Sequence, residues 1–141
     1  MLLRPAEPGD AEILLAWRND PLTRAMSRQQ DEVARADHLA WFERALADPR
    51  RIILIGTEQG RSVGMVRFDL GSPCEVSINL DPAVRGRGLS RTLLALALQG
   101  FASRPIEAEI REENLASHRL FEGAGFQRIT DRDGLRRYRL D

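Results

Sequence analysis

The chain of 141 residues contains no lysine: all 21 of its basic residues are arginine, and they are matched by 21 aspartate and glutamate residues. The absence of lysine excludes the P-loop of nucleotide hydrolases, because that loop grips phosphate with a lysine. The formal net charge is zero, so the chain lacks the basic excess that nucleic-acid binders usually show. We therefore predict no nucleic-acid partner.

Cysteine, histidine and long apolar runs are also scarce. Cys74 is the only cysteine, so an internal disulfide is excluded, and with only His38 and His118 beside it we expect no metal site. No apolar run approaches the roughly 18 residues that a membrane helix needs. The N-terminus lacks the pattern of a secretion signal. From these absences we predict a cytoplasmic protein with no membrane partner.

Apolar periodicity predicts the order of the strands and helices along the chain. A chain of this length fits a single domain over residues 1–141. We predict an α/β (α+β) domain whose mixed sheet has helices on both faces, because three consecutive strands interrupt any simple alternation. The strands are expected at 2–5, 50–56, 63–69, 74–81, 105–110, 128–130 and 135–140. A first helix is expected to begin after Asp10, which would cap it. Further helices are expected to span 37–46, 89–102 and 114–123.

The turn from Asn79 to Ser90 carries the first chemical signal. Gly86 and Gly88 leave backbone N–H groups open to an anion, and the helix that begins immediately afterwards directs its positive dipole end to the same place. Arg85 and Arg87 add mobile positive charge. A dinucleotide-binding fingerprint is excluded, because Arg91 stands where the third glycine is required. The pattern predicts a cradle for phosphate, most simply a pyrophosphate.

Two motifs together resemble one family. The run Arg85-Gly-Arg-Gly-Leu-Ser90 follows the spacing R-x-x-G-x-(G/A) except at its last position. The segment Asn114–Phe126 follows N-x-x-(A/S)-x-x-(L/F)-(Y/F)-E-x-x-G-F at nearly every position. Both resemble signatures of the GNAT N-acetyltransferase superfamily, in the same order. The resemblance implies a mostly antiparallel sheet with a splayed strand pair, and acetyl-CoA as the acyl donor without a metal.

The resemblance also implies which residues hold acetyl-CoA. The pantetheine arm would lie between the strands 74–81 and 106–110, pairing with the backbone of the first strand. The pyrophosphate would meet the N–H groups of the glycine turn, and the final helix would flank the thioester. The implied cofactor-binding residues are Ile78, Asn79, Leu80, Arg85, Gly86, Arg87, Gly88, Leu89, Ser90, Asn114, Ser117 and Phe121.

Glu75 and Ser77 are the candidate catalytic residues, because they lie on the polar face of the central strand. An amine of pKa near 10 must lose a proton before it attacks, and Glu75 would accept that proton directly or through water. The alternative for Glu75 is an ion pair with Arg67. Phe121 replaces the tyrosine that the family uses as general acid, so no acid is assigned.

Other reactive side chains receive structural roles. His118 is expected to be exposed, because it points about 100° around its helix from Ser117. Cys74 alternates onto the apolar face of its strand and is expected to pack in the core.

The acceptor is expected to bind near the N-terminal helices. Arg18, Met26, His38 and Trp41 are the candidate substrate-binding residues. The resemblance favours a nucleotide-linked amino sugar as the small-molecule amine acceptor. The alternatives are a protein N-terminus of the ribosomal-protein type, or an acyl-CoA-binding module with little catalysis. A monomer or a homodimer is expected.

Overall fold

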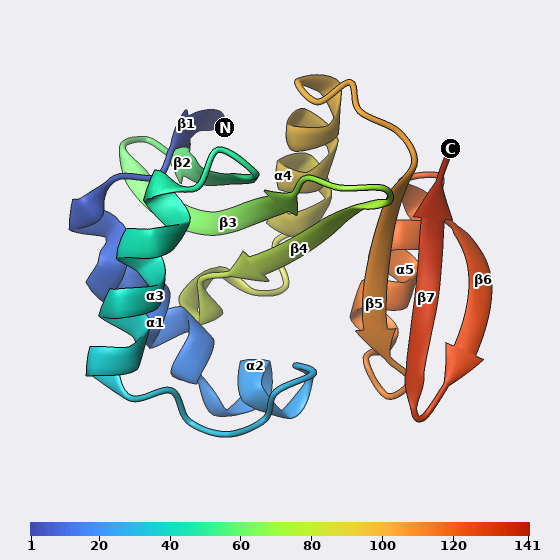
Figure 1. Cartoon of the computed structure of the whole chain (residues 1–141), viewed down its shortest axis with the longest axis horizontal. Coiled ribbons are helices and arrows are strands. Elements are labelled where there is room, and N and C mark those ends of the chain that lie inside the picture. The colour runs from blue at the N-terminus through green and yellow to red at the C-terminus, as the bar shows by residue number, and fades with distance from the viewer.

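The computed structural model describes all residues, 1–141, and contains one seven-stranded sheet of order β1-β2-β3-β4-β5-β7-β6 (Figure 1). The strands are β1 Leu2–Pro5, β2 Arg51–Glu58, β3 Arg61–Asp69, β4 Cys74–Leu80, β5 Ile106–Arg111, β6 Gln127–Arg132 and β7 Leu135–Leu140. The helices are α1 Ala11–Asn19, α2 Pro21–Ala25, α3 Arg35–Ala47, α4 Leu89–Gln99 and α5 Leu115–Gly123, with short 3-10 turns at Pro8–Asp10 and Pro82–Val84.

The sheet is mixed and mostly antiparallel, as the sequence analysis predicted. Only β4 and β5 pair in parallel, and every other neighbouring pair is antiparallel. The chain crosses over between β4 and β5 through α4, as a parallel connection requires. The β6–β7 hairpin closes through Asp133 and Gly134, both at positive φ, which is the two-residue turn that an Asp-Gly step favours. No helix has the length and apolar character needed to cross a membrane.

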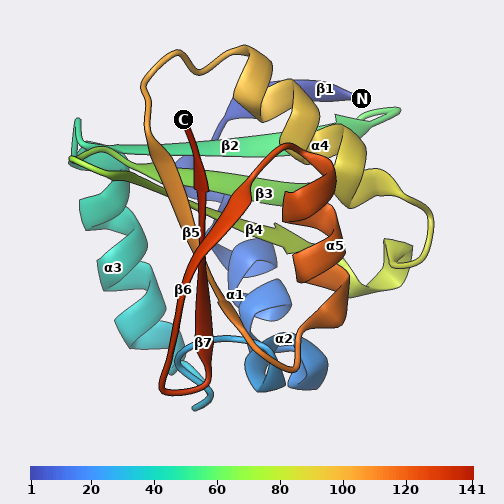
Figure 2. The same ribbon diagram turned by 90° about the vertical axis from the view of Figure 1, so that its right-hand side faces the viewer.

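Helices cover both faces of the sheet, and each face has its own core (Figure 2). On one face, Trp17 of α1 and Phe42 of α3 pack with Ile53, Ile55 and Met65. On the other face, α4 and α5 cover a larger cluster that contains Val66, Phe68, Cys74, Val76, Leu93, Leu94, Ile106, Ala108, Phe121 and Tyr138. The core of the first face involves β2 and β3, whereas β4 presents Glu75 and Ser77, which are both exposed.

Two paired glycines let α4 approach the sheet closely. Gly56 of β2 faces Gly64 of β3 in register, and Leu93 of α4 lies over both. A Cβ atom added to either glycine would stand 2.7 Å from a methyl carbon of Leu93. Because that distance is below van der Waals contact, a side chain at either glycine would push α4 outward. The beginning of α4, where the predicted phosphate cradle lies, is therefore fixed by the packing of the sheet.

Two local predictions were wrong at the N-terminal helices. The segment that begins at Pro21 forms the short helix α2, where no helix was predicted, because Asp20 caps it through Thr23 N–H at 3.1 Å and proline is favourable at the first helical position. Asp10 precedes α1 but gives it no side-chain cap. Its carboxylate instead accepts two hydrogen bonds from Arg4 at 2.7 and 2.8 Å and one from Glu7 N–H at 2.8 Å.

We predict that Asp10→Asn destabilises the protein at neutral pH but much less in acid. The Arg4 hydrogen bonds lower the pKa of Asp10. A carboxylate whose pKa is lowered by folding stabilises the folded state at pH values above its unfolded pKa, near 3.9. This stabilisation is lost as the pH falls through the pKa of the folded state. We expect the unfolding free energy to fall by about 1–3 kcal/mol at pH 7. Urea denaturation at pH 7 and near pH 3 measures this, with the exposed Asp31→Asn as control; an equal loss at both pH values would contradict it.

Candidate active site

β4 and β5 separate after their first residues. Cys74 pairs with Ile106 and Glu75 with Glu107, and the two strands form no further pairs, although seven and six residues belong to them. Figure 1 shows the two strands diverging toward their C-terminal ends. The backbone from Val76 to Leu80 therefore has no strand partner on the β5 side, and an extended ligand can pair there as a strand would. This is the splayed pair that the sequence analysis predicted.

The glycine turn lies at the C-terminal end of β4 and leads directly into α4. Gly86 and Gly88 have φ of 80° and 73°, a left-handed conformation that side chains rarely adopt. No atom lies within 4 Å of a Cβ built on either glycine, so the turn is open. Leu89 buries its side chain, but its N–H belongs to the first turn of α4, where helix amides lack intrahelical partners. The geometry fits an anion, which remains a prediction for these residues.

The Arg85 side chain is not the mobile cation that was expected. Its NH2 group donates to Asp20 Oδ2 at 2.5 Å and to Thr23 Oγ1 at 2.9 Å. The guanidinium hydrogen bond also lowers the pKa of Asp20. Arg85 therefore ties the glycine turn to the start of α2, and its own N–H donates to the Pro82 carbonyl at 3.5 Å. Arg87 is exposed and makes no ion pair, so the charge that can still move is the charge on Arg87.

A groove between the N-terminal halves of α4 and α5 continues from the glycine turn. Its cavity of about 250 Å³ is lined by Ser90, Arg91, Ala116, Ser117, Arg119 and Leu120. Asn114 caps α5 by accepting from Ser117 N–H at 3.3 Å, as predicted from its position. The sequence analysis missed Arg91 and Arg119. Arg91 directly follows Ser90, and Arg119 follows Ser117 by two residues. Both lie on the exposed side of their helix, and these positions were the only signal for them.

Two residues of α5 lie deeper than expected. Phe121 is 2% exposed and meets the Phe126 ring edge-on, with 5.1 Å between centroids; it packs in the core, and the cofactor contact expected of it stays a prediction. His118 is 5% exposed rather than on the surface. Its Nδ1 lies 2.9 Å from Tyr138 Oη and its Nε2 lies 3.1 Å from the carbonyl of Glu112. Both ring nitrogens are occupied, so His118 is a structural residue.

Glu75 pairs with Arg137 of β7, and the expected pair with Arg67 is wrong. Arg137 NH2 donates to Glu75 Oε1, Nε donates to Glu107 Oε1 at 2.6 Å, and NH1 donates to Glu109 Oε2 at 3.1 Å. The register explains the difference, because Glu75 lies opposite Asp69 on β3 and beside Glu107 on β5. Arg67 instead lies over the Trp41 ring, 5.5 Å from its centroid.

Arg137 holds three carboxylates in place on the open face of the sheet. Partial burial disfavours its charge, but the hydrogen bonds that it donates to Glu107 and Glu75 raise the pKa of Arg137 above its ordinary value. The side chain of Glu75 is still 49% exposed, and Glu75 is the last residue of β4 that pairs with β5, directly before the strands separate. Ser77 follows on the same face and is exposed. Cys74 faces the core, and burial raises the pKa of its thiol, which does not suit a nucleophile.

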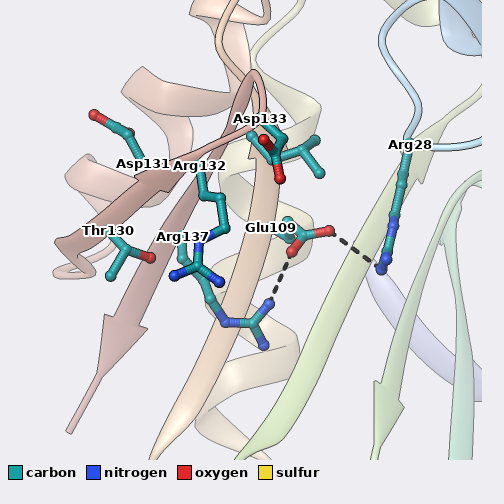
Figure 3. A pocket seen from close by; sticks show the side chains of 8 residues that line it. Arg28, Glu109, Thr130, Asp131, Arg132, Asp133 and Arg137 are labelled. Atoms are coloured by element: carbon teal, nitrogen blue, oxygen red, sulfur yellow. Dashed lines mark hydrogen bonds and ion pairs between the residues drawn. The ribbon is translucent and has the colours of Figure 1, made fainter.

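A polar cavity opens on this same face, between the loop at 26–34 and the β6–β7 hairpin (Figure 3). Its volume is about 490 Å³. Arg28, Glu109, Thr130, Asp131, Arg132, Asp133, Leu135 and Arg137 line it. Six of these eight side chains are charged, and both signs are present. The sequence analysis missed this cavity, because its residues come from segments about a hundred residues apart and belong to no motif.

The four predicted substrate-binding residues do not line the cavity. His38 is 2% exposed, its Nε2 lies 2.9 Å from the Ala11 carbonyl, and its ring stacks on Phe42. Burial also lowers the pKa of His38. Contact of His38 with an acceptor stays a prediction. Arg18 lies 5.9 Å from the Trp41 ring centroid, and both are partly buried, as is Met26. Contacts of Arg18, Met26 and Trp41 with an acceptor stay predictions.

Comparisons with known proteins agree with this geometry. Residues 1–127 match the family model described as "Acetyltransferase (GNAT) domain". YwnH of Bacillus subtilis, named as a candidate phosphinothricin acetyltransferase, is 31% identical over 137 residues, which cover 89% of this chain and 83% of YwnH. The N-alpha-acetyltransferase RimI of Mycobacterium tuberculosis is 34% identical over 105 residues, which cover 70% of this chain and 63% of RimI.

A solved structure supports the donor as well as the fold. The yncA protein of Salmonella typhimurium, determined with its cofactor acetyl-CoA, is 25% identical with a TM-score of 0.81, covering all of this chain and 93% of its own. The open glycine turn, the unpaired edge of β4 and the groove between α4 and α5 suit the pyrophosphate and the pantetheine arm of that molecule. The chain therefore belongs to the GNAT acetyltransferase family and is an acetyl-CoA-dependent N-acetyltransferase.

Proposed function

We propose that this enzyme acetylates the primary amine of a small, charged acceptor that binds in the cavity between the loop at 26–34 and the β6–β7 hairpin. One observation carries the proposal: the cavity opens on the polar face of the splayed strands, beside the carboxylates that Arg137 holds. Its volume of about 490 Å³ suits a small molecule. Six charged side chains among eight suit a polar acceptor rather than an apolar one.

Glu75 is the group that we propose as the general base. Acetyl-CoA supplies the thioester when it is bound, and the acceptor must present a neutral amine to it. Arg137 orients Glu75 toward the opening, so that its free oxygen can take the amine proton directly or through a water held by Ser77. Near Ile78, β4 has no strand partner on its β5 side, so a backbone N–H directed to that side would hydrogen-bond the acetyl oxygen.

A nucleotide-linked amino sugar is less well supported than a small acceptor. The residues predicted to meet the nucleotide are dispersed, because His38 is buried and Arg18 lies over Trp41. The similarity to YwnH favours an amino-acid-like acceptor, since phosphinothricin combines an amine with acidic groups. The similarity to RimI keeps a peptide N-terminus as a second acceptor to be tested.

Release of the CoA thiol, followed in a panel of acceptors, tests the proposal. The panel contains phosphinothricin, glutamate, β-alanine, putrescine, a UDP-linked amino sugar and short peptides with free N-termini. We expect turnover with one or more of the small amines. Turnover confined to the nucleotide sugar or to peptides would contradict the proposed acceptor class. Tight acetyl-CoA binding without any turnover would indicate a binding module in place of the proposed transferase.

A further inference from the structure

We propose that the acceptor binds by inserting between Arg28 and Glu109, and that it is therefore a molecule carrying a primary amine together with an anionic group such as a carboxylate or phosphinate. The inference rests on the proposed function and adds to it the two residues that would select an acceptor with both charges. Figure 3 shows Glu109 between Arg28 and Arg137, with a hydrogen bond or ion pair to each.

The contact between Arg28 and Glu109 is easily exchanged. Arg28 NH1 lies 3.3 Å from Glu109 Oε1, and the Arg28 side chain is 79% exposed. An ion pair with one partner so exposed contributes little stability, because water screens it and a long side chain must be ordered to form it. Arg28 also belongs to the connection between α2 and α3, outside any helix or strand. A ligand cation can therefore replace its guanidinium at small cost.

Glu109, in contrast, is held in place from its other side. Its second oxygen accepts from Arg137 NH1 at 3.1 Å, and its side chain is only 24% exposed. Arg137 is fixed in turn by Glu107 and Glu75. Releasing Arg28 thus leaves a positioned carboxylate oxygen facing the cavity. An ammonium that takes the vacated position would share the Arg137 cluster with Glu75, the proposed base.

The charges that remain call for an anion on the same ligand. Once the ammonium meets Glu109, Arg28 is left beside it without a partner. Arg132, across the cavity on the β6–β7 turn, forms no salt bridge, although Asp133 follows it on that turn. A ligand bearing only positive charge would meet two arginines. A ligand bearing both charges would exchange one ion pair for two, since its anion meets Arg28 or Arg132 and its amine meets Glu109.

The test compares acceptors with and without the anionic group in matched variants. Phosphinothricin, glutamate and β-alanine carry both groups, whereas putrescine and ethanolamine lack the anion. We expect the wild-type enzyme to prefer the first set in kcat/KM. Arg28→Ala should lower kcat/KM for that set about 10- to 100-fold, the range of one charge-assisted hydrogen bond, and leave the second set unchanged or improved. Arg28→Lys should restore part of the preference.

Binding and controls separate this inference from the proposed function. Calorimetric titration of the preferred acceptor into enzyme saturated with CoA should show weaker binding in both Arg28→Ala and Glu109→Gln. Binding should be unchanged in the control Arg44→Ala, because Arg44 is an exposed residue of α3 away from the cavity. Turnover of small amines with no effect of either variant would overturn the inference and leave the proposed function standing. So would a wild-type preference for putrescine or ethanolamine. Absence of turnover with every small amine would overturn both.

Discussion

Gly88→Asp is expected to raise the KM for acetyl-CoA by about 10²–10³-fold. Gly88 has φ of 73°, where an L-residue is strained, and its surroundings are open. A carboxylate placed there would also lie in the turn proposed to receive the pyrophosphate, so like charges would repel each other at close range. Steady-state kinetics and direct titration with CoA measure the effect, which should appear mainly in KM and much less in kcat.

Gly60→Asp is the matched control for this change. Gly60 lies in the β2–β3 turn at φ of 79°, again with no atom within 4 Å of a built Cβ. The control therefore imposes a similar backbone strain and adds the same charge at a different turn. We expect a similar fall in Tm for both variants but a normal KM for Gly60→Asp. A normal KM in Gly88→Asp, or the same rise in both, would remove the phosphate role from the glycine turn.

Glu75→Gln is expected to lower kcat by about 10²–10⁴-fold, the usual contribution of a positioned general base. The amide oxygen of glutamine can still accept from Arg137 NH2, so the side chain should keep its place while losing its ability to take a proton. The KM for acetyl-CoA should change little, because Glu75 lies on the acceptor face. The shape of the pH–rate profile should change, because the group proposed to take the amine proton is lost.

Glu107→Gln distinguishes a base from a structural partner of Arg137. Glu107 accepts from Arg137 Nε at 2.6 Å and is the neighbour of Glu75 in register. It is only 7% exposed, so it cannot reach the acceptor. This variant should lower Tm and leave the shape of the pH–rate profile intact. If both variants reduced kcat equally without altering that shape, Glu75 would be a positioning residue only.

Most of the fold was predictable because its signals are local. The alternation in β4, the apolar spacing in α4, and the Asp-Gly step of the hairpin each act within a few residues. Errors arose where a side chain had two possible partners. Aspartate is a common helix cap, but the carboxylate of Asp10 accepts hydrogen bonds from Arg4 and from Glu7 N–H instead. His118 falls on a helix face that would be exposed without Tyr138 from β7.

The proposed donor site and the proposed acceptor site also differ in how far they could be predicted from local signals. The glycine turn and the start of α5 are continuous segments, and each presents backbone groups whose position follows from the segment itself. The cavity proposed for the acceptor joins Arg28 to Glu109 and to the β6–β7 turn. Such contacts depend on which strands become neighbours, and no spacing along the chain encodes them.

The sequence by itself determined the family, the donor and the turn that is proposed to hold it, because these depend on glycine conformation and helix ends, which are local properties. Only the tertiary structure decided how the charges are paired. It paired Glu75 with Arg137 and Arg85 with Asp20, and it placed Arg28 against Glu109 at the mouth of the cavity. It also buried His38 and His118. The physical reason is that an ion pair or a buried hydrogen bond is selected by distance in space among many similar arginines and carboxylates.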